Sequence, residues 1–508
     1  MRTPAPRVTG LETEFAILCA PTGRQSCDAP PPPDIEAAAA LLFRHRPAGY
    51  RSNNLFLPNG GRLYLDVGSH PEYATAECLA VRDLVAQDQA GKAILATMAT
   101  SAEEDLRSRG LSARLHLLAN NTDSAGHTYG CHESYSVPRD LDEGAVLPVL
   151  AAFLATRPLL VGSGTPLAGP AEGGQQDRAG ADHADQEDED LAWALSPRAP
   201  HLRALTSADT TGQRALINTR DEPHADPARL RRLHVTCADT TIAEPTTGLR
   251  SALTLALLDA LEAGQDFSDL VLADPLEVLA ALGASSWGQE PVRTRDGRLL
   301  SAVDIQESFL ERILAFVQRH DPPAALEGAG HLLSDLAPRV ITALRRRDIS
   351  GIDTEIDWAI KRRLLRAQRE RHGGLGGEAL AVLRSRIDLA YHDLHPQTGL
   401  AGRLEAQGAM ARLCSPQERQ RAQTEPPATR AQLRGAFIQA CLDRGADFSV
   451  TWEGLRLDSP PTTPVDLPDP LRVQDPGAES LIGKVRSLRP EQMRQIDLVG
   501  RGGLGAPG

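Results

Sequence analysis

The sequence predicts an α+β fold in which a mainly antiparallel sheet packs against helices. Residues 1 to about 250 contain short runs of alternating apolar and polar residues bounded by Gly, Pro and Asn, whereas residues 251 to about 410 are mostly helical in pattern. Alternation is typical of half-buried strands, and apolar residues at helical spacing indicate helices. The length of 508 residues exceeds the usual size of one hydrophobic core, so more than one domain is expected.

Individual elements follow from these periodicities. Four alternating runs are expected to form strands: 7–18, 61–67, 113–119 and 233–238. Three segments with apolar residues at helical spacing are expected to form helices: 78–98, 250–263 and 351–365. No internal repeat is visible.

Composition shifts divide the chain. Pro426-Pro427 marks a boundary, so we expect a main domain over 1–424, a small C-terminal domain over 425–480 and a flexible tail over 481–508. The small domain is predicted from an amphipathic helix over 429–443 and a strand over 448–457. Segment 166–190 is rich in Gly, Ala, Gln and acidic residues and has little to bury, so a disordered acidic surface insertion is predicted.

Charge and cysteine content exclude several classes of protein. A net charge of −13 argues against nucleic acid as the main partner, because nucleic-acid binding uses basic surfaces. Basic clusters at 229–232, 345–347 and 361–366 are either solvated helix faces or a docking site for an acidic partner. The seven scattered cysteines form no C-x-x-C pair, which argues against a disulfide framework or a zinc site.

No segment is typical of a membrane or secreted protein. The longest apolar stretch, 145–162, is interrupted by Pro148, Arg157 and Pro158, and no signal peptide is visible. We therefore expect a soluble cytoplasmic protein. A G-x-G-x-x-G match at 500–505 is rejected because no strand and helix flank it, and no Walker A motif is present.

The run 61–67 carries the first candidate chemistry. Because side chains alternate along a strand, the apolar residues at 63, 65 and 67 share one face and can pack into a core. Arg62, Tyr64 and Asp66 share the other face. A base, a phenol and an acid together suit a ligand site, although a half-exposed sheet with a surface ion pair would give the same pattern.

The flanking residues favour the ligand site. Glu12 and Glu14 share one face of the run 7–18, and His70 and Glu72 follow Asp66 after a turn. Several carboxylates on one sheet face would repel one another and raise each other's pKa, which a hard cation relieves. Mg²⁺ takes oxygen ligands and shares its coordination sphere with phosphates. The pattern therefore predicts a metal–nucleotide site that lacks a P-loop.

Longer motifs carry a family resemblance. They are GLETEF (10–15), NGGRLYLDVGSHPEYATAEC (59–78), NNTDSAG (120–126), YGCHESY (129–135), INTRDEPHAD (217–226), RRLHV (231–235), DTEIDWAIKRRL (353–364), DLAYHDL (388–394) and TRAQLRGAFI (429–438). In this order they resemble the Pup–protein ligase family, which is related in fold to glutamine synthetase. The resemblance runs from about 7 to 475 and implies a curved glutamine synthetase-like sheet as the catalytic domain.

The resemblance implies an ATP- and Mg²⁺-dependent ligase. ATP would phosphorylate the γ-carboxylate of the C-terminal glutamate of Pup, a small disordered ubiquitin-like protein. A lysine amine of a target protein would then displace phosphate, which marks the target for the proteasome. Because Pup is acidic, a local basic groove is needed, and 361–363 is a candidate only through its clustered charges.

Residue roles follow from the resemblance, motif by motif. It implies Asp66 as the general base. The implied Mg²⁺ positions are Glu12, Tyr64 and Glu72, although a neutral phenol is a poor ligand. The implied ATP contacts are Arg62, Thr75 and Trp452.

Four further residues are weaker candidates. Glu14 and Glu133 are further metal-site candidates, and Arg220 and His224 are candidate phosphate or glutamate contacts. His132 and His234 are interpreted as structural. Ser134 replaces the asparagine that the family usually has after Cys-His-Glu.

Three alternatives remain. The nearest is a Pup deamidase or depupylase of the same fold, but that branch has a longer loop where only 51 residues separate Glu12 from Tyr64. It also differs from the Gly-Ser-His-Pro-Glu-Tyr motif found at 68–73. The others are a catalytically inactive Pup-binding homologue, which the retained site residues argue against, and a small-molecule glutamate–amine ligase.

Overall fold

The centre of the molecule is an eight-stranded sheet in the order β10-β11-β12-β7-β1-β5-β4-β3. The computed structural model describes residues 5–23, 31–66, 68–123, 128–166, 193–209, 214–282, 287–320, 324–373 and 377–489. The strands are β1 (Thr9–Glu14), β3 (Asn54–Phe56), β4 (Arg62–Asp66), β5 (His70–Ala74), β7 (Cys131–Pro138), β10 (Ala204–Ser207), β11 (Ala215–Asn218) and β12 (Leu230–Ala238). Neighbouring strands pair antiparallel except for β10 and β11, so the predicted mainly antiparallel sheet is confirmed.

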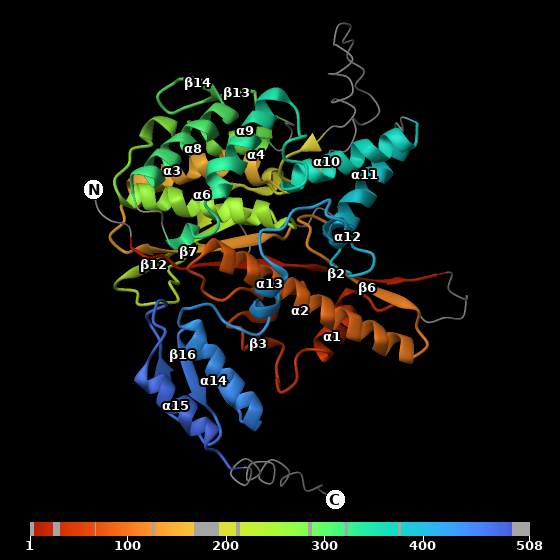
Figure 1. Cartoon of the computed structure of the whole chain (residues 1–508), viewed down its shortest axis with the longest axis vertical. Helices are drawn as coiled ribbons and strands as arrows, with labels where there is room; N and C mark the ends of the chain where they lie inside the picture. Colours follow the sequence, from red (N-terminus) through yellow and green to blue (C-terminus); the bar gives the residue numbers. More distant parts are fainter. Residues whose placement is uncertain are drawn as a thin grey trace, which may run out of the picture.

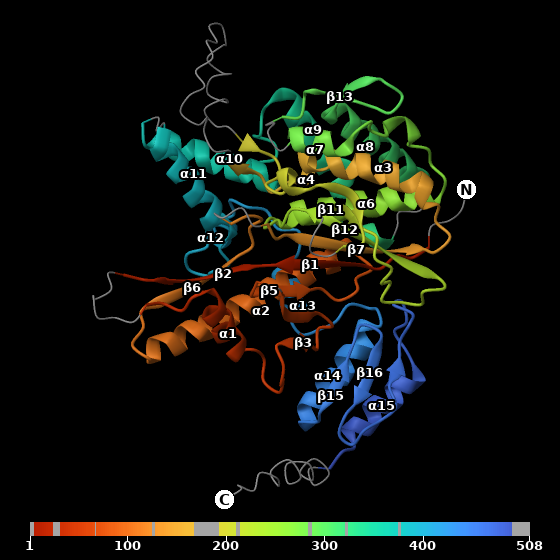
Figure 2. The same cartoon turned by 180° about the vertical axis from the view of Figure 1, so that it is seen from behind.

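Helices cover the apolar face of this sheet. Those beside β7 and β12 are α3 (Glu143–Thr156), α4 (Pro158–Val161), α6 (Glu244–Glu262), α7 (Pro275–Leu282), α8 (Ala302–Arg319) and α9 (Ala337–Arg346) (Figures 1 and 2). Those nearer β2 and β6 are α1 (Ile35–Arg44), α2 (Val81–Ser108), α10 (Asp357–Arg371), α11 (Gly377–His392), α12 (Leu400–Ala406) and α13 (Pro416–Ala422). Two large hydrophobic clusters lie between sheet and helices, and they hold the sheet's apolar face in place.

Within the described residues, three shorter sheets have two strands each. They are β2 (Ala16–Pro21) with β6 (Ala113–Leu118), β8 (Thr165–Pro166) with β9 (Trp193–Ala194), and β13 (Pro291–Arg293) with β14 (Leu299–Ser301). The run predicted as one strand over 7–18 is thus two strands, β1 and β2, in two different sheets. Phe15 lies between them and is buried in the core. The alternation of buried and more exposed residues continues from β1 into β2, so the sequence pattern did not show that the two strands pair with different neighbours.

The C-terminal residues form a separate small unit with its own core. It contains α14 (Ala431–Arg444), β15 (Phe448–Val450), β16 (Gly454–Leu457), β17 (Val465–Asp466) and α15 (Pro476–Arg486), and it lies at one end of the molecule (Figure 1). Leu433, Phe437, Leu457 and Leu481 belong to a cluster distinct from those of the main sheet. The predicted helix is present, and the exact domain boundaries stay a prediction.

Two predicted elements differ in detail. The single strand expected over 448–457 is the hairpin β15–β16, in which Thr451 N–H donates to the Gly454 carbonyl across a tight turn. A short hairpin preserves alternation, so periodicity alone did not separate its two strands. The helix expected over 351–365 begins only at Asp357, because Ile356 is extended and residues 351–355 form turns.

The prediction of a basic groove at 361–363 is wrong. Lys361 is 1% exposed and Arg362 is fully buried, because α10 packs these residues inward against the core. The predicted insertion at 166–190 lies outside the described residues except for Pro166. The flexible tail expected over 481–508 starts too early, because α15 continues to Arg486 and its Leu481, Ile482 and Val485 are buried in the core of the C-terminal unit. Residues 490–508 lie outside the described residues. Among the described residues, no helix is both long and apolar enough to span a bilayer.

Candidate active site

β1 lies in the middle of the sheet, between β5 and β7, and presents two glutamates. Its residues alternate between buried and partly exposed, with Leu11 and Thr13 buried and Glu12 and Glu14 on the opposite face. A central strand is paired on both sides, so its side chains are held in place by two neighbours. The predicted shared face of Glu12 and Glu14 is confirmed.

The register of β1, β5 and β4 brings three carboxylates together. Glu14 lies opposite Glu72, and Glu72 lies opposite Tyr64. One carboxylate oxygen from each of Glu14, Asp66 and Glu72 lies within 4.8 Å of the others. Glu72 is 3% exposed, whereas Asp66 at the end of β4 is exposed. The same acid cluster therefore contains one carboxylate in a desolvated setting and one in contact with solvent.

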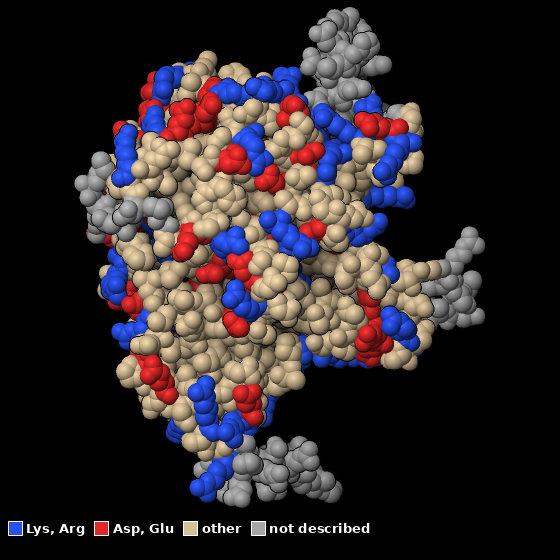
Figure 3. All heavy atoms as spheres, in the orientation of Figure 1, with Lys and Arg blue, Asp and Glu red and all other residues tan. Residues whose placement is uncertain are grey.

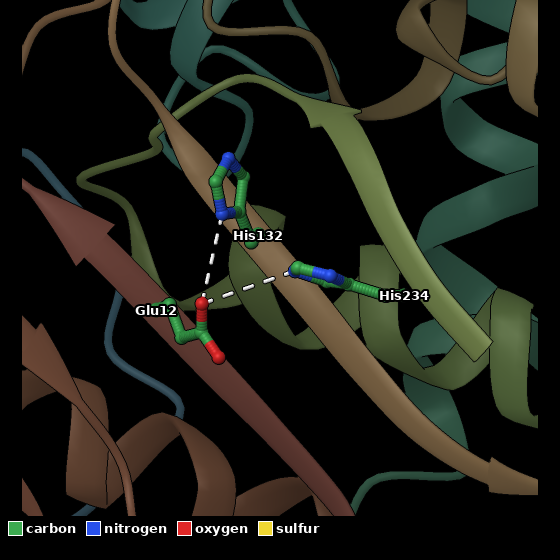
Figure 4. A group of neighbouring side chains, drawn as sticks. All are labelled: Glu12, His132 and His234. Carbon is green, nitrogen blue, oxygen red and sulfur yellow. Dashed lines mark ion pairs between the residues drawn. The ribbon is translucent and has the colours of Figure 1, made fainter. Parts of the chain in front are cut away.

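A second group lies toward β7 and β12, whereas the acid cluster lies toward β5 and β4 (Figure 4). Glu12 lies opposite His132 on β7, and His234 enters from β12, where it pairs with Ser134. The Glu12 carboxylate lies 3.6 Å from His132 Nδ1 and 3.8 Å from His234 Nε2. Three ligand-type atoms thus converge within 4.8 Å, which changes the interpretation of both histidines as structural.

The charges of these groups are strongly perturbed. Burial and repulsion from Glu12 and Glu14 raise the pKa of Glu72 well above its usual value. Burial and the charge of Glu72 also raise the pKa of Tyr64, whose hydroxyl donates a hydrogen bond to Glu72. Tyr64 is therefore a neutral donor in this arrangement.

Glu12 and His234 shift in the opposite direction. Burial raises the pKa of Glu12, but the hydrogen bond from His132 and the nearby charges, including Arg232, outweigh it, so the pKa lies well below its usual value. Burial lowers the pKa of His234 to about 3. An ionised carboxylate and a neutral imidazole are the forms that bind metal ions.

Both groups fit a divalent cation. The His234 Nε2 atom is buried and finds no hydrogen-bond partner within the described part of the chain. On the other side, Glu14, Asp66 and Glu72 bring three carboxyl groups close together. A bound Mg²⁺ would relieve this repulsion and would use oxygen ligands of the preferred type.

A pocket of about 80 Å³ adjoins Glu12. It is lined by Thr75, His224 and Trp452, together with Arg232 and the first residues of β1. Thr75 is fixed because its hydroxyl accepts a hydrogen bond from Leu11 N–H at 3.0 Å. The Trp452 ring packs edge-on against Phe56 and lies 6.4 Å from the His224 ring. The structure thus brings residues predicted to contact nucleotide to one pocket beside a predicted metal ligand.

Arg62 lies on the same sheet face as Tyr64. Its Nε donates to the Asn54 side chain at 2.8 Å, and its guanidinium lies over the Tyr64 ring at 4.3 Å. Both contacts orient the cation along β3 and β4, next to the acid cluster.

Glu133 and Arg220 are not brought to these groups. Glu133 follows His132 on β7, so it points to the opposite face, where its fully buried carboxylate pairs with Arg157. Arg220 is half exposed, pairs with Glu222 and lines a different pocket of about 190 Å³.

Comparison with known proteins shows which proteins share this arrangement. Residues 7–456 match the family model described as Pup-ligase protein. The chain belongs to the Pup-ligase family. Pup–protein ligases from Xylanimonas cellulosilytica and Saccharomonospora viridis are 40% identical to it, and that from Mycolicibacterium smegmatis is 38% identical. Each alignment covers 94% of this chain and 99% of the relative.

Solved structures of Pup ligases have the same fold as this family member. The complex between the prokaryotic ubiquitin-like protein Pup and its ligase PafA matches with a TM-score of 0.84 and 31% identity, covering 99% of this chain and 98% of that one. The Pup ligase PafA in complex with ADP matches with a TM-score of 0.77 and 34% identity, covering 91% and 95%. The family predicted from the motifs is therefore confirmed.

Sequence reasoning missed three residues of this Pup-ligase family site. His132 and His234 reach Glu12, and Arg232 contacts the same carboxylate at 3.4 Å. The alternation of β7 and β12 places these side chains on one sheet face, so a signal existed. Which strand pairs with which, and in what register, was needed to use it.

Proposed function

We propose that this chain is an ATP-dependent ligase that joins the C-terminal glutamate of Pup to lysine side chains of target proteins. The observation that carries the proposal is the placement of an acid cluster, Glu14, Asp66 and Glu72, on the same sheet face as a pocket walled by Thr75 and Trp452. Relatives 38–40% identical over nearly the whole chain are Pup–protein ligases, which favours ligation over the hydrolase alternative.

In the first step, the γ-carboxylate of the glutamate attacks the terminal phosphorus of ATP. The bond between that phosphorus and the bridging oxygen breaks, and ADP leaves with an acyl phosphate formed. Phosphoryl transfer depends mainly on position and on neutralisation of charge. Thr75, His224 and Trp452 would hold the nucleotide, and Arg62 would offset charge that develops on the phosphoryl oxygens.

In the second step, the lysine amine attacks the acyl carbon. The C–N bond forms, phosphate leaves, and one proton must be removed from the nitrogen. Because an unperturbed lysine has a pKa of about 10.4, roughly one amine in a few thousand is uncharged at neutral pH. Asp66 is suited to accept the proton because it is exposed at the end of β4, where an incoming lysine can reach it.

Mg²⁺ would be held on both sides of β1. Glu12 with His132 and His234 would form one position, and Glu14 with Glu72 the other. The bound ion would neutralise phosphate charge during transfer. Tyr64 would act through its hydrogen bond to Glu72, because a neutral phenol is a weak ligand.

The partners that we propose are Pup, lysine-bearing target proteins and, through them, the proteasome pathway. The solved complex of PafA with Pup matches this chain over almost its whole length, which supports Pup as the first of these. A small-molecule ligase would need no extended partner surface, and an inactive homologue would need none of the carboxylates brought together around β1.

The decisive experiment compares two directions of reaction. The protein is incubated with ATP, Mg²⁺, Pup ending in glutamate and a lysine-bearing protein, and separately with a preformed Pup conjugate. We expect a new isopeptide-linked adduct and one ADP for each bond formed. Release of Pup from the conjugate without any adduct would establish the hydrolase instead. Omission of ATP is the control and should abolish the adduct.

A further inference from the structure

Glu77 is a buried carboxylate that belongs to neither candidate metal group. It lies just beyond β5, two residues after Thr75, and it lines the pocket that Thr75 and Trp452 share. Its side chain is only 12% exposed, and two arginines of the C-terminal unit bind it. Arg430 Nε donates to it at 2.7 Å, and Arg434 donates through both terminal nitrogens.

Arg430 connects Glu77 to one wall of the pocket. Its remaining nitrogens donate to the backbone carbonyls of His224, at 2.6 Å, and Leu467, at 2.8 Å. His224 has a left-handed backbone, with φ of 48°, which an L residue adopts only when its surroundings hold it. The hydrogen bond from Arg430 to its carbonyl is one such restraint.

Arg434 connects Glu77 to a second residue of the pocket lining, Trp452. It donates to the carbonyl of Trp452 at 3.1 Å and to that of Gly60 at 2.9 Å. Its guanidinium also lies over the Trp452 ring at 4.9 Å and over the Phe56 ring at 5.6 Å. Backbone and ring of Trp452 are therefore both held by one side chain.

The carboxylate is needed because of where the arginines lie. Arg430 and Arg434 are four residues apart around the start of α14, on one side of the helix, and both are almost completely buried. Two desolvated like charges at this spacing would repel. Burial raises the pKa of Glu77, but the charges of Arg434 and Arg430 lower it to about 2, so the carboxylate is ionised at neutral pH.

We propose that Glu77 is a positioning residue for nucleotide binding, which it performs by holding Arg430 and Arg434 so that they fix His224 and Trp452, two neighbouring residues of the pocket lining. The inference rests on the proposed function, because it assigns that pocket to ATP. It also explains how the C-terminal unit contributes to the active site: α14 brings two cations that the catalytic sheet anchors through one acid.

The test measures ADP affinity by calorimetry in the full-length protein and in Glu77→Gln, Arg434→Lys and Glu405→Gln. Glu405 is the matched control, since it is a 14% exposed carboxylate bound by Arg419 and Arg412 away from this pocket. Lysine at 434 keeps the charge but cannot donate to several acceptors in a fork as arginine does. Both substitutions remove hydrogen bonds that hold residues of the pocket lining, so we expect about tenfold weaker ADP binding in both pocket variants.

Two further measurements distinguish positioning from a general structural role. The KM for ATP should rise in Glu77→Gln, while kcat at saturating ATP stays near the wild-type value. Tryptophan emission should report the same change, because Trp452 is the half-buried one of the four tryptophans and Trp193, Trp287 and Trp358 are buried. ADP should alter the emission of the wild type and of Glu405→Gln at lower concentrations than in the two pocket variants.

The outcomes separate this inference from the proposed function. If the wild type does not bind ADP, the proposed function fails. If it binds and both pocket variants bind equally well, the positioning role is overturned, even if Glu77→Gln has a lower melting temperature. If Glu77→Gln does not fold, Arg434→Lys alone decides, and unchanged ADP affinity in that variant overturns the inference.

Discussion

The carboxylates of Asp66 and Glu72 lie in one cluster but in different surroundings. Glu72 is 3% exposed and accepts a hydrogen bond from Tyr64, whereas Asp66 is exposed at the end of its strand. Desolvation separates the behaviour of acids that share a site, because it penalises the charged form of the buried one. The residue in contact with solvent is the one suited to exchange a proton with an incoming amine.

Replacing Asp66 with Asn tests its role as base. The substitution keeps the shape of the side chain but removes its ability to accept a proton, so we expect conjugation to fall by about 10²–10⁴-fold. ADP affinity should not change, because Asp66 does not line the nucleotide pocket. Single-turnover conjugation and calorimetry check the two parts. Wild-type conjugation in Asp66→Asn would refute the assignment.

Replacing His234 with Gln tests the second metal position. The variant loses an imidazole nitrogen that lies 3.8 Å from the Glu12 carboxylate. We expect the Mg²⁺ concentration for half-maximal activity to rise by about 10-fold or more, in line with losses from altered metal sites. His320→Gln, on the end of α8 against Phe316, is the control. Equal Mg²⁺ dependence in both variants would exclude His234 from the site.

At the scale of elements, buried polar side chains join α10 to α11, and α11 to Ala119, which directly follows β6. Lys361 on α10 donates to Asp388 and to His392 Nε2 on α11, and His392 Nδ1 contacts the Ala119 carbonyl at 2.6 Å. His392 must be neutral to accept from Lys361. Accordingly, burial and the Lys361 charge lower its pKa to about 3. The contact therefore depends on protonation.

This pairing predicts a pH dependence of stability. His392 has a folded pKa of about 3, and the unfolded value is about 6.5. The unfolded state binds the proton first as pH falls, so stability is fully present above pH about 6.5 and decreases toward pH about 3. At about 1.4 kcal/mol per pH unit, the loss between pH about 6.5 and about 5 is about 2 kcal/mol.

Urea unfolding of the wild type and of His392→Gln at these two pH values measures this loss of stability. Glutamine cannot titrate, so the variant should lose about 2 kcal/mol less stability than the wild type over the same interval. The difference between the two proteins removes the contribution of other titrating groups. Identical pH dependence would contradict the assignment of a neutral buried His392.

At the scale of the whole molecule, the net charge of −13 opposes an acidic partner. Positive and negative side chains are interspersed over the face seen in Figure 3. Near the active site, however, a pocket of about 190 Å³ is lined by four arginines. They are Arg139, Arg220, Arg231 and Arg232. Two carboxylates, Asp221 and Glu143, line the same pocket and pair with Arg139 and Arg231. The lining beside β12 therefore has more arginines than carboxylates, although the chain as a whole is negative.

This balance predicts a salt-dependent affinity for Pup. Attraction between exposed charges more than about 10 Å apart is screened when the Debye length falls from about 30 Å at about 0.01 M salt to about 10 Å at about 0.1 M. We expect Pup affinity, measured by fluorescence anisotropy, to decrease over this range. ADP affinity in the same buffers serves as the comparison for general salt effects. A Pup affinity that does not change would count against an electrostatic groove.

Much of the site was predictable because strand alternation is a local property. The shared faces of Glu12 with Glu14 and of Arg62 with Tyr64 followed from a period of two, and both are present. Glu133 has the same chemical character, but its position in β7 turns it to the buried face. Assigning Glu133 correctly required knowing which face of the sheet it shares with residues of β1, and the pairing of β7 with β1 determines this.

The sequence by itself determined the family, the α+β class and the polar face of the central strands, because motifs and periodicity are encoded in neighbouring residues. Only the tertiary structure decided that His132 and His234 reach Glu12, that Lys361 and Arg362 are buried, and that Glu77 meets two arginines more than 350 residues away. These contacts depend on strand register and on the docking of α14, and both arise from packing between distant segments.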